Sequence, residues 1–414
     1  ISRNFAISGL GGGFYSNNST INIANTIIEW NSSNQGGGIN SNQSVLNFDE
    51  VSLLNNSNGN VNGGGGLYSY NSELNFSGIL ASGNYTSGSG GGMYIYGCTI
   101  ALLDMSIVNN TADQSGGGIS IAEGTVGNIS NSTVTDNEAT NGSGININSG
   151  TQNTLSFTDI TVAGNVASSS GGGFYMVYST TGIEITNSSV NRNTAVYGGG
   201  IYLHDSSNPI LTNTMVYGNT AAYGGGLYCK NNSNPTIRNV TITGNNGTSY
   251  GGGIYCLNSS DPVLTNSIVS HNIGGHGIYA YSSNPSISYS DFWDNELGNY
   301  HGAGEWIGEN VTINSNGDSC DVYSNIQIDP SYIDSEHDNY QIEDYSHCIG
   351  AGTLTGAPVA DIEGSLRPSP TGSNPDIGAY ENLQAAPQRM PVTINIPVDY
   401  ATIQAGLNVA DSTD

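Results

Sequence analysis

The chain has 414 residues, with 33 acidic against 6 basic side chains and a formal net charge of −27. A surface this acidic repels nucleic acids and anionic membranes, so neither is expected as a partner. No run of about 18 apolar residues predicts a membrane-spanning helix, and five cysteines do not make a disulfide scaffold. Plentiful aliphatic and tyrosine side chains argue against disorder.

Glycine clusters recur from residue 11 to residue 277. The last glycines of the clusters fall at 13, 38, 66, 92, 118, 144, 173, 200, 226, 253 and 277. A period of this size predicts a stacked array of repeats. We interpret each cluster as the same tight corner of a unit, where a positive φ is needed and a Cβ would obstruct the next unit. A phosphate-binding loop would require a following helix, which the pattern does not predict.

Each repeat contains two short strand patterns. After the glycines at 224–226, residues 227–229 alternate apolar, tyrosine and apolar; a turn at 231–235 and a second strand at 236–242 follow. Strands this short cannot bury a face alone, and no two-residue hairpin signal joins them. The sequence therefore predicts an all-β fold: a right-handed parallel β-helix of about eleven or more coils over residues 1–300.

Equivalent positions of the coils form three ladders. Apolar residues one and three positions past the glycines point inward, as in Ile201 and Leu203. A ladder of asparagines is expected to bond coil to coil; its members are Asn31, Asn84, Asn110, Asn137, Asn165, Asn193, Asn219 and Asn245. Between the inward residues an outward tyrosine recurs, most regularly at Tyr175, Tyr202, Tyr228, Tyr255 and Tyr279. These tyrosines either stabilise neighbouring strands by stacking or bind glycans or another protein as an exposed stripe.

The composition changes at residues 301–385, which we call the terminal segment. Residues 376–381 (DIGAYE) and the upstream D-x-x-G-x-x-R of residues 361–367 resemble the end of bacterial choice-of-anchor Q proteins, over about 60 residues. More distantly, the coils are similar to surface β-helices such as polymorphic outer-membrane proteins. The resemblance implies a secreted or surface-anchored β-helix and supplies no activity. We expect a charge network that closes the last coil; its members are Asp361, Arg367, Asp376 and Glu381.

The tail, residues 386–414, resembles the N-terminal cap of a β-helix, although it stands at the other end. Its apolar residues are Ile394, Ile396, Tyr400, Ile403 and Leu407. Residue 1 falls within a coil pattern and is not a methionine. Either the chain was cut from a longer tandem protein, or the tail caps the next copy and builds a head-to-tail filament.

The cysteines suggest two pairs. Cys320 and Cys348 both lie in the terminal segment and are expected to form a disulfide in an oxidising compartment. Cys229 and Cys256 are expected to stack inward in adjacent coils, where a disulfide and two buried thiols both remain open. Cys98 is left without a partner.

No catalytic pattern stands out. The acidic residues occupy different coil positions, and His204, Asp205 and Lys230 fit solvated turns. Residues 314–321 imitate a calcium loop but lack the terminal glutamate. We therefore expect no cofactor, with calcium as a weak alternative, and a non-enzymatic extracellular or cell-surface structural or adhesive protein. Its expected partners are copies of itself, glycans or cell-surface components. The alternative is a polysaccharide-binding β-helix or a polysaccharide lyase or glycosidase.

Overall fold

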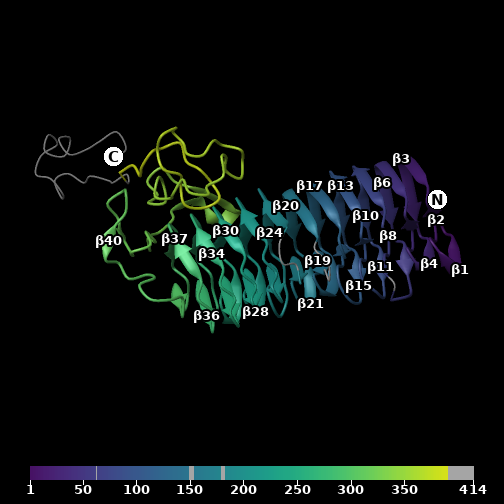
Figure 1. Ribbon diagram of the computed structural model, residues 1–414, viewed down its shortest axis with the longest axis horizontal. Coiled ribbons are helices and arrows are strands. Elements are labelled where there is room, and N and C mark those ends of the chain that lie inside the picture. The colour runs from purple at the N-terminus through teal and green to yellow at the C-terminus, as the bar shows by residue number, and fades with distance from the viewer. Residues whose placement is uncertain (62, 149–152, 179–181, 390–414) are drawn as a thin grey trace, which may run out of the picture.

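The computed structural model describes residues 1–61, 63–148, 153–178 and 182–389. They are almost entirely strands and turns, and η1 (Ser335–His337), a 3-10 helix, is the sole helix among them. The coils stack into an elongated parallel β-helix of about eleven turns (Figure 1), which confirms the expected all-β solenoid. Within the described ranges, no helix has the length and apolar character needed to cross a bilayer.

Three parallel sheets run along the stack. The first contains β2 (Phe14–Asn17), β5 (Ile39–Asn42), β8 (Leu67–Tyr70), β12 (Met93–Tyr96), β16 (Ile119–Ala122), β19 (Ile145–Asn148), β22 (Phe174–Val177), β25 (Ile201–His204), β29 (Leu227–Lys230), β33 (Ile254–Leu257), β36 (Ile278–Tyr281) and β39 (Tyr300–His301). The second contains β3 (Thr20–Glu29), β6 (Val45–Leu54), β9 (Glu73–Ser77), β10 (Leu80–Ser82), β13 (Thr99–Leu103), β14 (Ser106–Val108), β17 (Val126–Thr135), β20 (Thr154–Ala163), β23 (Ile183–Thr186), β24 (Ser189–Asn191), β26 (Ile210–Thr212), β27 (Met215–Tyr217), β30 (Thr236–Arg238), β31 (Thr241–Thr243), β34 (Val263–Thr265), β35 (Ile268–Ser270), β37 (Ser286–Ser288) and β38 (Asp291–Trp293). The third contains β1 (Phe5–Leu10), β4 (Ser32–Gln35), β7 (Ser57–Asn58), β11 (Tyr85–Thr86), β15 (Thr111–Ala112), β18 (Glu138–Asn141) and β21 (Val166–Ser170), and the pair β28 (Thr220–Tyr223) and β32 (Asn246–Tyr250) lies further along the chain.

The strands pair in register from coil to coil. In the first sheet Ile201 pairs with Leu227 and Leu227 with Ile254, and all three side chains are fully buried. Because side chains alternate between the two faces of a strand, this register places every equivalent inward residue on its counterpart above and below. The result is one continuous apolar core along the axis.

The glycine corners depend on two separate properties of glycine. Gly198 has a φ of +62°, in the left-handed region that favours glycine. Gly200 instead lies where a Cβ would stand 2.7 Å from the carbonyl oxygen of Gly226 in the next coil. The first glycine of the cluster therefore makes the turn, and the third lets neighbouring coils approach.

The asparagine ladder runs inside another corner. In each rung the backbone N–H and the side-chain Nδ2 donate to the Oδ1 of the next asparagine, as Asn165 does to Asn193 at 3.0 and 2.9 Å. Asn165 also donates from Nδ2 to the carbonyl of Val134 at 2.9 Å. The ladder also includes Asn56, Asn272 and Asn295, which were not among the predicted members. Asn56 lies ten residues before its last glycine, so its spacing concealed it.

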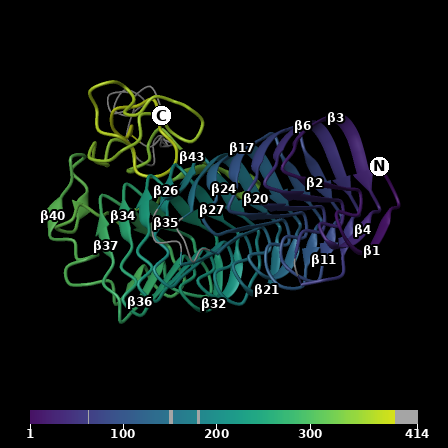
Figure 2. The same ribbon diagram turned by 45° about the vertical axis from the view of Figure 1, so that its right-hand side comes forward.

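The terminal segment folds back along one side of the coils. Figure 2 shows the later part of this segment (yellow) against the second sheet, where β42 (Tyr332–Asp334) pairs antiparallel with β43 (Asn339–Ile342). The earlier part (green) contains the antiparallel pair of β40 (Thr312–Ile313) and β41 (Ser319–Cys320), and β40 lies at the end of the stack. Corner asparagines hold the later part: Asn213 donates to the carbonyl of Ala360 at 2.7 Å, and Asn266 to that of Thr353 at 2.8 Å. Met215 and Ile268, outward residues of β27 and β35, are buried beneath it.

Replacing Asn165 with alanine should lower the free energy of unfolding by about 2–4 kcal/mol, because the change leaves buried backbone and side-chain groups of both neighbouring rungs without partners. Chemical denaturation measures the difference. The control is Asn47→Ala, which removes the more exposed ladder contacts to Asn22 and Asn75 and should cost less than about 0.5 kcal/mol. Equal losses in the two variants would contradict a specific role for the buried ladder.

Candidate functional site

The five predicted tyrosines stack along the first sheet. This inner tyrosine row (Tyr175, Tyr202, Tyr228, Tyr255 and Tyr279) has successive ring centroids 5.4, 5.0, 4.7 and 5.6 Å apart. The expected exposure is wrong for its three central members, because Tyr202, Tyr228 and Tyr255 are only 5, 3 and 8% exposed. Tyr175 and Tyr279, at the two ends, are half-buried.

A second line of tyrosines explains this burial. The outer tyrosine row (Tyr197, Tyr223 and Tyr250) comes from the residue just before the glycine cluster and packs over the inner row. Tyr197 and Tyr223 stack at 5.3 Å, and Tyr223 and Tyr250 at 5.9 Å. Tyr197 is 38% and Tyr250 43% exposed. We call the two rows together the aromatic band.

The outer row was not predicted from the sequence, although its signal is present there. Tyrosine directly precedes three glycines in three consecutive coils, at 197, 223 and 250. A residue beside a corner is outside the alternating pattern of a strand. The pattern therefore does not predict whether its side chain points inward or outward. Only the folded corner turns these rings over the neighbouring strand. In Figure 1, β28, which ends at Tyr223, and β36 lie along the lower side of the stack.

Histidines stack on two members of the inner row. His301 stacks on Tyr279 at 4.2 Å and lies 5.1 Å from His276. Burial, and then the charge of His301, lower the pKa of His276. Within the row, His204 stacks on Tyr202 with the ring centroids 5.7 Å apart.

The buried phenols of Tyr202, Tyr228 and Tyr255 stay protonated at neutral pH. Burial raises the pKa of Tyr255 to about 12, and it raises those of Tyr202 and Tyr228 as well. These three rings therefore carry no phenolate charge and offer uncharged ring faces and hydroxyl groups. Surfaces of this kind form contacts with large area at low conformational cost.

His204, Asp205 and Lys230 belong to a local contact between the turns of neighbouring coils. The Nδ1 of His204 lies 3.2 Å from Asp205, and Asn231 donates from Nδ2 to the same carboxylate at 2.9 Å. His204 pairs in register with Lys230 of the next coil. Burial lowers the pKa of His204, so at neutral pH the ring is neutral. Within the described chain, no three histidine, cysteine, aspartate or glutamate side chains gather as a metal ion would require.

The structure brings the four charged residues of the terminal segment together. Arg367 and Glu381 form a fully buried ion pair, with Nε 3.1 Å from Oε2 but out of line for a hydrogen bond, and Nη1 donates to the carbonyl of Gly378 at 3.1 Å. Burial lowers the pKa of Arg367. Asp361 accepts from the backbone N–H of Glu381 at 3.0 Å, and Asp376 from that of Gly350 at 2.8 Å. The carboxylates thus fasten separate loops to one another.

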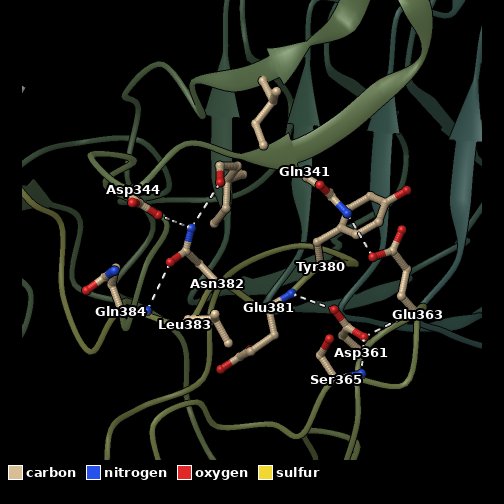
Figure 3. A pocket seen from close by; sticks show the side chains of 12 residues that line it. Gln341, Asp344, Asp361, Glu363, Ser365, Tyr380, Glu381, Asn382, Leu383 and Gln384 are labelled. Atoms are coloured by element: carbon tan, nitrogen blue, oxygen red, sulfur yellow. Dashed lines mark hydrogen bonds between the residues drawn. The ribbon is translucent and has the colours of Figure 1, made fainter.

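A cavity of about 390 Å³ opens beside this network (Figure 3). Its carboxylates already have partners. Asp361 Oδ1 accepts from the N–H groups of Glu363 and Ser365 at 2.9 and 2.8 Å, and Glu363 accepts from Gln341 Nε2 at 2.8 Å. A carboxylate held by backbone donors stabilises a turn and is a weak candidate for a general base.

All five cysteines are free, buried thiols, so the expected Cys320–Cys348 disulfide is not formed. Cys348 instead lies with its Sγ 3.6 Å from the carboxylate of Asp291, in the apolar cluster that also contains Cys320. Cys229 and Cys256 pair in register and point inward as thiols. Cys98 lies 3.5 Å from the hydroxyl of Ser69.

The calcium-like segment forms a polar turn. Asn314 Oδ1 accepts hydrogen bonds from the N–H groups of Asn316 and Asp318 at 2.9 Å. The Oδ1 of Asp318 lies 2.7 Å from the Nδ1 of His347. Asp321 accepts from the N–H of Asn325 at 3.0 Å. The predicted polymerisation residues Ile394, Ile396, Tyr400, Ile403 and Leu407 lie outside the described residues, so that hypothesis stays a prediction.

Comparison with known proteins agrees with this architecture. A family model described as right handed beta helix region matches residues 140–250 and 172–328. The stack is thus a right-handed parallel β-helix. The crystal structure of pectate lyase Pel9A is similar with a TM-score of 0.38 and 15% sequence identity, over 84% of this chain and 88% of that chain. At this TM-score the likeness implies nothing about activity. No curated protein matches the sequence.

One buried carboxylate lies where the coils meet the terminal segment. Asp291 is fully buried at the first position of β38, where earlier coils carry residues such as Ser189. It accepts from the N–H of Ile328 at 3.2 Å and faces Cys348 and, more distantly, Asp329. Burial raises the pKa of Asp291 well above its usual range.

Asp291→Asn should stabilise the protein at neutral pH. Because the folded pKa is raised, the stabilisation from Asp291 is complete below its unfolded pKa of about 3.9 and is lost as pH rises through the folded pKa. Asparagine keeps both contacts and does not titrate. The D291N variant should therefore be more stable than the wild type as the pH is raised, and this difference in stability should vanish in acid. Melting temperatures across this range measure it. Asp294→Asn, at an exposed carboxylate, is the control; an identical pH profile for D291N and the wild type would contradict the prediction.

Proposed function

We propose that this chain is an extracellular or cell-surface β-helix without catalytic activity, and that its aromatic band binds neutral glycans. The observation that carries the proposal is the exposure of the outer tyrosine row on top of a buried one. Tyr197, Tyr223 and Tyr250 present partly exposed rings whose positions are fixed by stacking on the row beneath. Pre-ordered rings lose little conformational freedom on binding.

The charge of the chain favours a neutral ligand. A net charge of −27 opposes the approach of anionic polymers such as uronic-acid polysaccharides. The uncharged rings of the band contribute no compensating positive charge. A neutral glycan that stacks its C–H faces on the rings avoids this repulsion.

We favour a binding protein over an enzyme because the acidic groups that an enzyme would use already have hydrogen-bond or ion-pair partners within the protein. In the cavity of Figure 3, Asp361 and Glu363 accept hydrogen bonds, and Glu381 pairs with Arg367. A polysaccharide lyase or glycosidase is the alternative. It would require carboxylates that face a substrate on both sides of the scissile bond.

Replacing Tyr197, Tyr223 and Tyr250 together with serine should weaken binding to neutral polysaccharides by about tenfold or more. The stability cost should be modest, about 1 kcal/mol per ring, because each is partly exposed. Tyr228→Ser, in contrast, should cost about 3–5 kcal/mol, as expected for a buried aromatic side chain. Affinity electrophoresis in gels with neutral polysaccharides measures binding, and denaturation measures stability.

The matched control removes another stacked pair, Tyr70 and Tyr96, whose rings lie 5.2 Å apart away from the aromatic band. Serine at both positions should leave binding unchanged. Unchanged binding in the triple variant, or an equal loss in the control, would refute the band as the binding surface.

A second candidate function is head-to-tail assembly through residues 386–414. Two observations favour it. The tail resembles an N-terminal cap, and the inward residues Phe14, Ile21 and Ile23 of the first coil are only partly buried, whereas their counterparts in the next coil are buried. Apolar edges of parallel stacks accept a further layer.

Deleting residues 391–414 should convert concentration-dependent assemblies of this chain into monomers, because the layer that covers the first coil is lost. Sedimentation velocity at several protein concentrations measures the change. A full-length chain that is monomeric throughout, or a truncated chain that still assembles, would contradict head-to-tail capping.

A further inference from the structure

The last coil ends in a cavity of about 410 Å³ that is separate from the aromatic band. One wall is the turn from Asn284 into β37 (Ser286–Ser288), and the other is the segment 303–307, with Tyr323 at the side. The segment passes over the end of the stack, where a further coil would otherwise begin. The volume of the cavity lies in the range of small-molecule sites.

Two aromatic side chains line this cavity without covering it. Trp306 is 52% and Tyr323 43% exposed. The ring contacts of the described residues include none between these two, so the space between them is not filled by their own stacking. Two ring faces on a shared cavity form a pair of surfaces for a flat, weakly apolar ligand.

Trp306 is held in this position by a strained backbone. Its φ is +69°, in the left-handed region that bulky residues avoid. Strain of this kind costs about 1–3 kcal/mol and persists where the surrounding structure imposes it, often at ligand sites. Ile307, the next residue, packs against the apolar core. This anchor fixes the segment while the indole remains exposed.

A polar ladder ends in the same cavity. In successive coils the side chain before a proline accepts from the N–H of its counterpart: Asn234 accepts from Asp261 at 2.6 Å, and Asp261 from Asn284 at 2.5 Å. Asn284 is the last rung, and its carboxamide makes no hydrogen bond within the described chain. It is therefore available to hydroxyl groups of a ligand, as is the exposed carboxylate of Glu305 beside it.

We propose that this cavity binds one hexopyranose ring of a neutral glycan. The C–H face of the ring stacks on Trp306 with Tyr323 at its side, and the hydroxyl groups bond to Asn284 and Glu305. The carboxylate of Glu305 and the net charge of −27 disfavour uronic acids. This cavity shares no residue with the aromatic band, so the proposal for the cavity does not depend on glycan binding by the band.

A ligand-observed NMR titration of the full chain with methyl glycosides of glucose, galactose and mannose tests the proposal, with galacturonic acid as the anionic comparison. At least one neutral glycoside should bind more tightly than galacturonic acid. Trp306→Asn, a residue that tolerates a positive φ, should weaken that binding by about tenfold or more. Trp306→Phe should retain most of the affinity because it keeps a ring face.

Trp30→Asn is the matched control, because Trp30 is also exposed (56%) at a positive φ (+55°), in the first coil. Its variant should bind as the wild type does, and so should the triple variant of the outer tyrosine row. Thermal melting checks that W306N remains folded, and Tyr323→Ser provides a second loss of affinity. Absence of binding by all three neutral glycosides, unchanged affinity in W306N, or an equal loss in W30N would overturn the proposal.

Discussion

Close stacking of one coil on the next is the constraint on which the rest of this structure depends. Neighbouring coils hydrogen-bond through their backbones, and this spacing permits no side chain where Gly200 meets Gly226. The same spacing lets one asparagine satisfy two rungs, as Asn165 does between Asn137 and Asn193. Because every coil repeats the geometry, any residue type that recurs in the sequence becomes a line along the rod.

The aromatic band follows from this constraint. Strand spacing brings equivalent rings to stacking distance, and a second tyrosine at the corner covers the first row. The inner row thereby becomes part of the packing, and the outer row becomes the surface. Stability and proposed binding therefore reside in different tyrosines, Tyr228 in the first group and Tyr250 in the second.

The ends of the stack carry the chain's exceptions to repetition. Where the glycine clusters stop, the segment after β39 closes the end and leaves Trp306 in a strained conformation over a cavity. The terminal segment then folds back on the second sheet, fastened by Arg367 and Glu381 within it and by Asn266 beneath it. A repeat supplies the scaffold, and the non-repeating residues supply individual sites.

The sequence by itself determined the coil period, the parallel stack, the inward residues and most of the asparagine ladder, because each recurs at a fixed offset from the glycines. It also singled out the four charged residues that the structure gathers around Arg367. Only the tertiary structure decided that Tyr228 is buried, that Cys320 and Cys348 are separate thiols, and that Trp306 and Asn284 share a cavity. The physical reason is that a periodic pattern fixes which residues align along the rod. What covers an aligned row, and what closes the end of the stack, depends on corners and segments that have no period.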